Sequence, residues 1–211
     1  MLRALIVANG DMPSPSLLHQ YAALADLVVA ADGGGDKALA AGLMPGAVVG
    51  DLDSLSPDGR QQVGEDRVHR DADAETTDLE KAIAYALAAG ATRIDVAGAG
   101  GGRADHALAN LSVLVNFAGS ADVRIIDDHF EIRRVQGETV IEGESGTVVS
   151  LLALGECTGV TTSGLRWPLD DVTLHFSPRG VHNEIAEPPA TVRVASGDLL
   201  LFQGRWVERH R

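Results

Sequence analysis

Short β-prone runs alternate with longer Ala/Leu-rich runs over the first two-thirds of the chain, and this alternation constrains the fold most strongly. The helical runs carry apolar residues at helical spacing, as in Leu17, Leu18, Tyr21 and Leu24. Such alternation is typical of a mostly parallel sheet covered by helices. The sequence therefore predicts an α/β fold with a Rossmann-like three-layer domain. The expected strands are residues 4–7, 27–31, 47–50, 93–97 and 123–126.

The pattern changes near Val135. From there, β-prone pieces are separated by Gly, Pro and Asp, and no convincing helical run remains. This pattern predicts a smaller all-β domain, either a sandwich or a barrel-like sheet. We therefore expect one domain over residues 1–134 and a second over residues 135–211.

Composition excludes several classes of protein. The 211 residues include 17 Lys and Arg against 30 Asp and Glu, a formal net charge of −13. This charge disfavours binding to nucleic acid or to an anionic membrane, whereas it favours a cationic small molecule. One cysteine, Cys157, allows neither an intrachain disulfide nor a cysteine-rich zinc site. No apolar run approaches the roughly 20 residues that span a bilayer, so we expect a cytoplasmic protein.

Polar residues follow several of the predicted strands. In open α/β sheets, ligands bind beyond the carboxyl ends of the strands, so these positions are candidates for a site. A predicted helix start, Thr77 followed by Asp78, could face the same edge. The strand-end segments are Asn9-Gly10-Asp11, Asp32-Gly33-Gly34, Asp51-Leu52-Asp53-Ser54 and Gly98 through Asp105.

Asp51 and Asp53 are the first candidates for a metal site. In an extended segment their side chains would lie on one face, about 6 to 7 Å apart. Oxygen ligands without cysteine favour Mg²⁺ over Zn²⁺, and Mg²⁺ is typically bound by one or two carboxylates, water and substrate phosphates. The alternative is that the two residues only start a turn into Ser54 and Pro57.

The segment from Gly98 to His106 has the features of an anion site. Its glycines allow backbone N–H groups to approach a phosphate, and just after them a helix is expected over residues 105–117. Arg103 could donate two hydrogen bonds to a phosphate, and Asp105 is either a magnesium ligand or the helix N-cap. The segment lacks the third small residue of a dinucleotide fingerprint, so we exclude a Rossmann NAD site.

The other candidates have plainer interpretations. Asp32-Gly33-Gly34 could be a strand-ending turn or a close approach to a nucleotide. Thr77 is a plausible N-cap, with Glu80 as its capping-box partner, and Asp78 is a favourable acid in the first helical turn or a third carboxylate of the site. Trp167 could be a core aromatic of the β domain.

The order and spacing of these motifs resemble the thiamine pyrophosphokinase family along nearly the whole chain. The matching pieces are Asp32-Gly33-Gly34, Gly50-Asp51-Leu52-Asp53-Ser54, Asp73 followed by Thr77-Asp78-Leu79-Glu80, Gly101-Gly102-Arg103-Ala104-Asp105-His106, Gly164-Leu165-Arg166-Trp167-Pro168-Leu169, and Asn183-Glu184.

The resemblance implies a homodimer that transfers pyrophosphate from ATP to thiamine and releases AMP. Residues 1–134 would form the nucleotide- and Mg-binding catalytic domain, and residues 135–211 would contribute to the thiamine pocket and the dimer interface. Asp51, Asp53 and Asp78 would bind Mg²⁺ and act in catalysis with Arg103 and Asp105. The nucleotide would contact Asp32, Gly33, Gly34, Thr77, Gly101, Gly102 and Arg103, and thiamine would contact Trp167, His182 and Asn183.

Two positions differ from the family pattern. Leu52 stands where Phe is frequent, and His182 replaces the usual Ser before Asn183. The second change affects the expected contact with the thiamine pyrimidine. Asp78 or Asp53 could accept the hydroxyl proton, but a metal-bound carboxylate is a poorer base, so the base stays open. Two alternative functions also stay open: transfer to another heterocyclic alcohol such as a hydroxymethylpterin, and a nonenzymatic Mg-nucleotide-binding module.

Overall fold

The computed structural model describes residues 1–207, which divide into two compact units. The first ends at Asp128 and the second begins at His129. The sequence predicts this boundary between residues 134 and 135. It lies earlier because strand β7 (Phe130–Arg134) pairs antiparallel with β14 (Leu199–Val207), so β7 belongs to the second unit.

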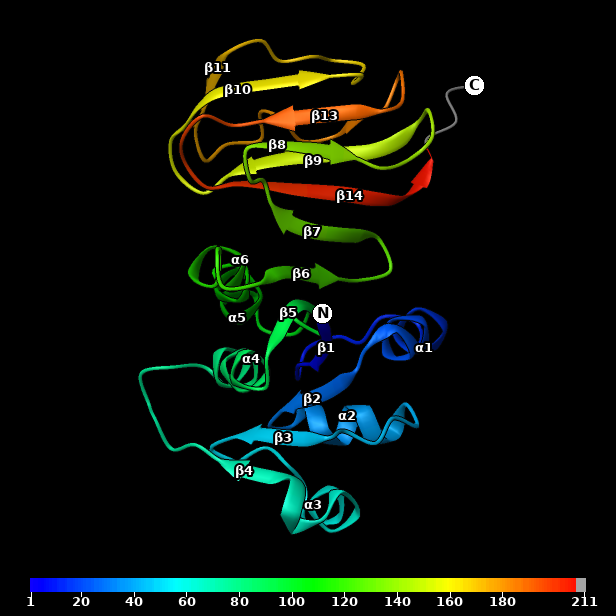
Figure 1. The fold of residues 1–211 in the computed structure, drawn as a ribbon, viewed down its shortest axis with the longest axis vertical. Helices are drawn as coiled ribbons and strands as arrows, with labels where there is room; N and C mark the ends of the chain where they lie inside the picture. The colour runs from blue at the N-terminus through cyan, green and yellow to red at the C-terminus, as the bar shows by residue number, and fades with distance from the viewer. Residues whose placement is uncertain (208–211) are drawn as a thin grey trace. The chain divides into compact units, whose positions relative to one another are not determined.

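The first unit has a parallel sheet with strand order β6-β5-β1-β2-β3-β4. Helices cover both faces: α1 and α2 lie on one side and α4, α5 and α6 on the other (Figure 1). The inner strands are almost fully buried, as expected where helices cover both faces of a parallel sheet. The strands are β1 (Leu2–Val7), β2 (Leu27–Ala31), β3 (Ala47–Gly50), β4 (Val68–Arg70), β5 (Ala91–Ala97) and β6 (Asp122–Ile126).

The first unit differs from the sequence prediction in two respects. The helix expected between residues 105 and 117 is divided, because Leu114 and Val115 donate to carbonyls three residues back, at Leu111 and Ser112. The sequence also did not predict α3, the short 3₁₀ helix η1 or β4. The helical elements are α1 (Pro15–Leu24), α2 (Gly34–Ala40), α3 (Pro57–Val63), η1 (Glu65–Arg67), α4 (Asp78–Ala88), α5 (Ala104–Asn110) and α6 (Val113–Asn116).

The second unit contains two antiparallel sheets, β12-β9-β14-β7 and β11-β10-β13-β8. Apolar side chains from both sheets form one core that includes Val149, Val160 and Val192. Every element described in this unit is a strand, so the predicted all-β tail is confirmed. Its further strands are β8 (Glu138–Ile141), β9 (Thr147–Ala153), β10 (Cys157–Ser163), β11 (Val172–Leu174), β12 (Asn183–Glu184) and β13 (Ala190–Arg193).

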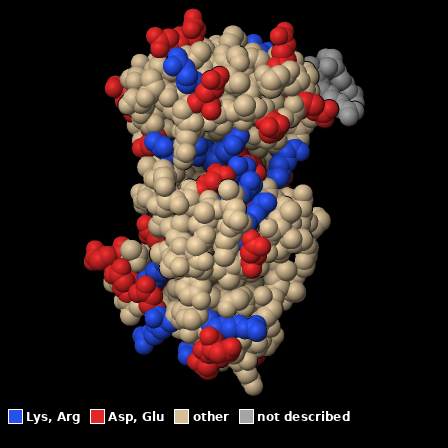
Figure 2. Space-filling view, viewed as in Figure 1, with Lys and Arg blue, Asp and Glu red and all other residues tan. Residues whose placement is uncertain are grey.

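No helix formed by residues 1–207 is long and apolar enough to cross a membrane. The negative charge is not spread evenly over the surface. On the face shown in Figure 2, acidic side chains gather in separate groups with Lys and Arg among them. The net charge of −13 therefore does not describe this face as a whole, and ligand preferences have to be argued from individual sites.

Candidate functional site

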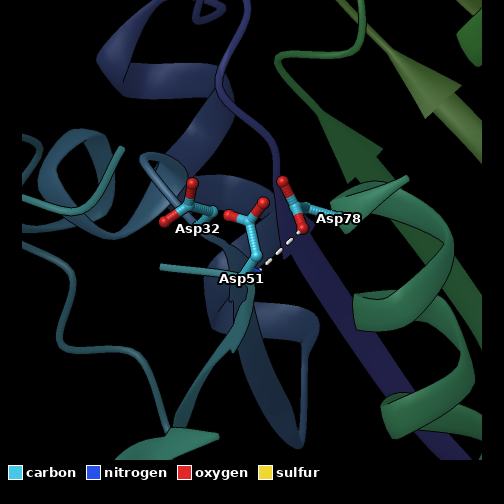
Figure 3. Close-up of side chains that lie close together, drawn as sticks. All are labelled: Asp32, Asp51 and Asp78. Atoms are coloured by element: carbon cyan, nitrogen blue, oxygen red, sulfur yellow. Dashed lines mark hydrogen bonds between the residues drawn. The ribbon is translucent and has the colours of Figure 1, made fainter. Parts of the chain in front are cut away.

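Three carboxylates from three elements meet at the carboxyl edge of the first sheet. Asp32 follows β2, Asp51 follows β3, and Asp78 is the first residue of α4 (Figure 3). One oxygen from each lies within 4.8 Å of the others. We call these three residues the carboxylate group. Neighbouring parallel strands bring Asp32 and Asp51 together, and the start of α4 adds the third acid.

The carboxylate group differs from the predicted metal set of Asp51, Asp53 and Asp78. Asp32 is a member, although the family resemblance assigns it to the nucleotide. Its position directly after a strand is the signal that could have identified it. Asp53 is not among the three residues whose oxygens lie within 4.8 Å. Its carboxylate instead accepts a hydrogen bond from the Ser54 hydroxyl at 2.9 Å.

The backbone explains why Asp51 and Asp53 do not share one face. Leu52 has a positive φ of 68°, so the segment turns instead of continuing as an extended strand. The Asp53 amide donates to Oδ1 of Asp51 at 3.2 Å, which closes an Asx turn. The predicted extended geometry is therefore wrong. Asp32 also has a positive φ, of 44°, and such strained residues cluster at functional sites.

Asp32 anchors the turn that carries Asp51. It is 3% exposed, and its two oxygens accept hydrogen bonds from the amides of Ser54 and Leu55, each at 3.0 Å. Burial raises the pKa of the Asp32 carboxyl, and repulsion from Asp78 adds to this rise, while the two amide hydrogen bonds oppose it. A divalent cation beside Asp32 would favour its ionised form.

The third acid is held by a locally encoded helix start. Thr77 caps α4: its side chain accepts from the Glu80 amide, and the Glu80 side chain accepts from the Thr77 amide. The capping box predicted from the sequence is thus confirmed. It places Asp78 in the first turn, where Oδ1 accepts from the Asp51 amide at 3.3 Å and from the Lys81 ammonium at 3.1 Å.

The donor atoms of the carboxylate group fit a hard divalent cation. Mg²⁺ binds oxygen at about 2.0 to 2.1 Å, so two oxygens around one ion lie at most about 4 Å apart. One oxygen from each acid already lies within 4.8 Å of the others, close to that limit. Water and substrate oxygens would supply the other ligands.

Gly50 allows the three acids to approach one another. A Cβ atom at this position would lie 2.8 Å from Cβ of Asp32 and 3.0 Å from Oδ1 of Asp78. We expect Gly50→Ala to displace one or both acids, to lower the free energy of unfolding by about 1 to 3 kcal/mol, and to weaken Mn²⁺ binding. Denaturant unfolding and Mn²⁺ titration measure the two effects.

The matched control is Gly46→Ala, just before the same strand. There a Cβ atom would meet Cδ1 of Leu27, a mobile side-chain end, at 3.1 Å. This variant is expected to keep its Mn²⁺ affinity. Equal losses of affinity in the two variants would show that the strand, and not the approach of the acids, is responsible.

The glycines after β2 and β5 allow close contacts between segments of the protein itself, independently of any nucleotide. A Cβ atom at Gly34 would lie 2.0 Å from the Val7 carbonyl oxygen, and one at Gly33 would lie 2.4 Å from Nδ2 of Asn9. At Gly101, φ is 78° and a Cβ atom would meet Asp11 at 2.1 Å. Gly102, with φ of 62°, has open space around it. Contacts of these residues with a nucleotide remain a prediction.

Arg103 and Asp105 form an exposed ion pair. Nη2 and Nε of Arg103 donate to the two oxygens of Asp105, at 2.6 and 3.1 Å. This double hydrogen bond lowers the pKa of the Asp105 carboxyl to about 2. Asp105 is not the helix N-cap: Arg103 occupies that position, and Asp105 lies in the first turn of α5. The remaining Arg103 donors are available to an anion.

In the second unit, Trp167 and Asn183 lie together. The Asn183 side chain accepts from the Trp167 amide at 3.2 Å and donates to the Trp167 carbonyl at 2.7 Å. Asn183 is 8% exposed whereas Trp167 is 51% exposed, so Trp167 is not the core aromatic of the plainer interpretation. Asn183 therefore holds the backbone that presents an accessible indole ring.

Two charged residues that the sequence did not single out as site residues complete this cluster. The Arg166 guanidinium lies 5.3 Å from the centre of the Trp167 ring and is paired with buried Glu184. Glu184 thereby balances the positive charge beside the ring. His182 has φ of 63°, and its amide donates to the Ser150 hydroxyl at 2.9 Å. These contacts define the surroundings of the three predicted thiamine contacts.

Comparisons with known proteins agree with this arrangement. Residues 18–126 match the family model described as thiamin pyrophosphokinase, catalytic domain, and residues 137–199 match thiamin pyrophosphokinase, vitamin B1 binding domain. The chain is 30% identical to the thiamine pyrophosphokinase of Bacillus subtilis over 206 residues, covering 94% of this chain and 96% of that protein. It is also 30% identical to thiamine pyrophosphokinase 1 of Oryza sativa subsp. japonica.

Solved structures show the same fold. The crystal structure of the Bacillus subtilis thiamine pyrophosphokinase superposes with a TM-score of 0.82 at 25% identity, covering 96% of this chain and 98% of that one. The yeast thiamin pyrophosphokinase, at 18% identity, has a TM-score of 0.78 over 96% of this chain and 86% of its own. The match spans only 65% and 63% of the two rice relatives, thiamine pyrophosphokinases 1 and 3. Two matched domains and a relative covered almost end to end place this chain in the thiamin pyrophosphokinase family.

Proposed function

We propose that this chain transfers the pyrophosphoryl group of MgATP to the hydroxyl of thiamine, giving thiamine diphosphate and AMP. The observation that carries the proposal is the carboxylate group at the edge of the sheet, in a chain whose two domains match the family's catalytic and vitamin B1 binding models. In the transfer, a bond forms between the thiamine oxygen and the β-phosphorus. The bond from that phosphorus to the AMP oxygen breaks, and the hydroxyl proton leaves to a base that we do not assign.

Positioning and electrostatics would provide most of the catalysis, because no covalent intermediate on the protein is needed. Asp32, Asp51 and Asp78 would hold Mg²⁺, and Asp53 remains a predicted further ligand whose side chain would have to rotate. The ion, when bound, would neutralise phosphate charge. Arg103, oriented by Asp105, would direct its free N–H donors to a phosphate.

The remaining predicted contacts belong to the same proposal. Gly33, Gly34, Thr77, Gly101 and Gly102 would border the nucleotide, and Trp167, His182 and Asn183 would contact thiamine. A homodimer and a cytoplasmic location also remain predictions. His182, where the family usually has Ser, is the residue most expected to change the contact with the pyrimidine.

Product analysis tests the proposed reaction directly. The full chain is incubated with MgATP and either thiamine or a hydroxymethylpterin, and nucleotides and acceptors are separated by chromatography. AMP formed together with thiamine diphosphate supports the proposal. ADP as the only nucleotide product, or turnover with the pterin alone, would overturn it. Binding of Mg-nucleotide without release of AMP would identify a nonenzymatic module instead.

The exposed ring of Trp167 gives a test of the acceptor site. Stacking or a cation–π contact with thiamine would contribute about 0.5 to 2 kcal/mol, so Trp167→Ala is expected to raise the KM for thiamine about 2- to 30-fold. The KM for ATP should change little. Steady-state kinetics with each substrate varied in turn measure both constants, and equal increases in both would point to structural damage.

A further inference from the structure

Lys81 is a buried cation next to the carboxylate group. It lies on α4 among apolar residues and is 6% exposed. Within residues 1–207, no other Lys or Arg is buried. Its ammonium group reaches Oδ1 of Asp78 at 3.1 Å, one helical turn back. The side chain thus points along α4 toward the carboxylate group.

The charge of Lys81 is not needed to form the helix. The capping box of Thr77 and Glu80 already starts α4, and the buried residues Ile83 and Ala86 pack it against the sheet. Burying an ammonium group costs free energy, and an apolar residue of similar volume often packs as well or better. The helix alone therefore does not explain why a charged residue is buried here, and the neighbouring carboxylate group is the place to look for its role.

The hydrogen bonds of Asp78 show what Lys81 does to the carboxylate. Oδ1 accepts from both the Lys81 ammonium and the Asp51 amide. Oδ2 accepts no hydrogen bond from any residue in the described part of the chain, and in Figure 3 the second oxygen of Asp78 points away from the Asp51 amide. Two donors on one oxygen fix the rotation of the carboxylate, and they leave the other oxygen open to a ligand.

The net charge of the carboxylate group and Lys81 together also favours a bound divalent cation. Three ionised carboxylates and one ammonium carry a formal charge of −2, which one divalent cation balances. Like charges this close repel one another, and the ammonium reduces that repulsion before a cation arrives. The Lys81 ammonium has two opposing effects on cation binding. It orients a carboxylate ligand, which strengthens binding, and it repels the cation, which weakens binding.

We propose that Lys81 is a positioning residue for the divalent-cation site: its ammonium group holds Oδ1 of Asp78 and presents Oδ2 to the ion. This inference rests on the proposed function, because it assumes that the carboxylate group binds a cation. Lys81 touches neither the ion nor the substrates. It acts through Asp78, and the orienting effect outweighs the repulsion.

Mn²⁺ binding to the full chain without nucleotide, followed by electron paramagnetic resonance, tests the proposal independently of turnover. Lys81→Met keeps a similar volume in the buried position and removes the ammonium. Loss of a residue that orients a metal ligand typically weakens metal binding about 10- to 100-fold, and we expect a loss of at least about tenfold. If repulsion dominated, removal of the positive charge would tighten binding. Unchanged or tighter binding overturns the proposal.

A double-mutant cycle shows whether Lys81 acts through Asp78. Asp78→Asn alone is expected to weaken Mn²⁺ binding, and adding Lys81→Met should weaken it no further, because the oriented ligand is already lost. Additive losses overturn the proposal. If Asp78→Asn itself leaves Mn²⁺ binding intact, the proposed metal site fails. If only Lys81→Met leaves binding intact, the role of Lys81 fails and the metal site stands.

Two further variants separate this role from general effects on folding and charge. Lys81→Gln keeps an N–H donor without a charge and should bind Mn²⁺ with an affinity between those of the wild type and Lys81→Met; the reverse order overturns the proposal. Arg60→Met removes an exposed cation, 44% accessible and paired with Glu65, and should leave Mn²⁺ affinity unchanged. In steady-state assays Lys81→Met should raise the Mg²⁺ concentration for half-activation while the KM for thiamine stays the same.

Discussion

Asp51→Asn is expected to lower kcat about 10²- to 10³-fold without changing the thermal unfolding midpoint. The substitution removes a charge from the carboxylate group, and loss of one group that stabilises transition-state charge typically costs that much. Asn can still accept the hydrogen bond from the Asp53 amide, so the turn should persist. Asp51 is exposed, so the core is not disturbed. Release of AMP from MgATP and thiamine measures the rate.

Asp53→Asn is the second variant to test, because the sequence predicts that Asp51 and Asp53 bind the metal together. Asp53 currently faces the Ser54 hydroxyl, so its substitution tests whether the side chain rotates to become a ligand. A loss of turnover comparable to that of Asp51→Asn would support this role. Full activity in both variants would refute the metal role of the pair.

The effect of added metal on thermal stability gives an independent test of the same site. A cation that binds only the folded chain stabilises it, so Mg²⁺ or Mn²⁺ should raise the unfolding midpoint of the wild type. The same addition should raise the midpoint of Asp51→Asn much less. An equal rise in both proteins would mean that the cation binds elsewhere.

Asp32→Ala has the second large expected effect, on both turnover and stability. The change removes one carboxylate of the group and also the acceptors for the Ser54 and Leu55 amides. Unpaired buried amides typically cost about 1 to 3 kcal/mol, and the relief of burying an ionised carboxylate offsets part of this. We expect a net loss of about 1 to 3 kcal/mol and a fall in kcat at least as large as that of Asp51→Asn. Denaturant unfolding and AMP release measure the two.

Asp36→Ala is a matched control for the loss of stability. Asp36 also holds a loop in the first unit: it accepts from the amide and the hydroxyl of Ser56, at 2.8 and 2.6 Å, and it is outside the carboxylate group. The control should lose similar stability while keeping far more activity than Asp32→Ala. A parallel fall in activity in both variants would assign the effect of Asp32 to the loop and not to the site.

Local patterns accounted for the features that depend on neighbouring residues. The alternation of β-prone and helical runs predicted the α/β unit, and the loss of helical spacing after Val135 predicted the all-β unit. The capping box at Thr77 and Glu80 was predictable because both partners lie within one helical turn. The divided helix at Leu111 and Ser112 was not, because nothing in the local spacing marks the tighter turn.

The motifs also pointed to the edge of the sheet at which the carboxylate group lies. Asp32, Asp51 and Asp78 were all singled out, since each follows a strand or starts a helix. Their division into metal and nucleotide ligands did not match the geometry of the carboxylate group. The reason is that Leu52 adopts a positive φ, which local sequence does not signal for a branched apolar residue, and this turn separates Asp53 from Asp51.

The sequence by itself determined the two classes of domain, the family and the positions at which chemistry could occur, because these depend on periodicity and on the order of motifs. Only the tertiary structure decided which acids meet. Pairing of β2 with β3 brings Asp32 beside Asp51, the approach of α4 adds Asp78, and Lys81 is buried on the same helix in contact with Asp78. The Asp51-Leu52-Asp53 segment alone does not show which residues will be its neighbours, because those contacts depend on packing between elements far apart in the sequence.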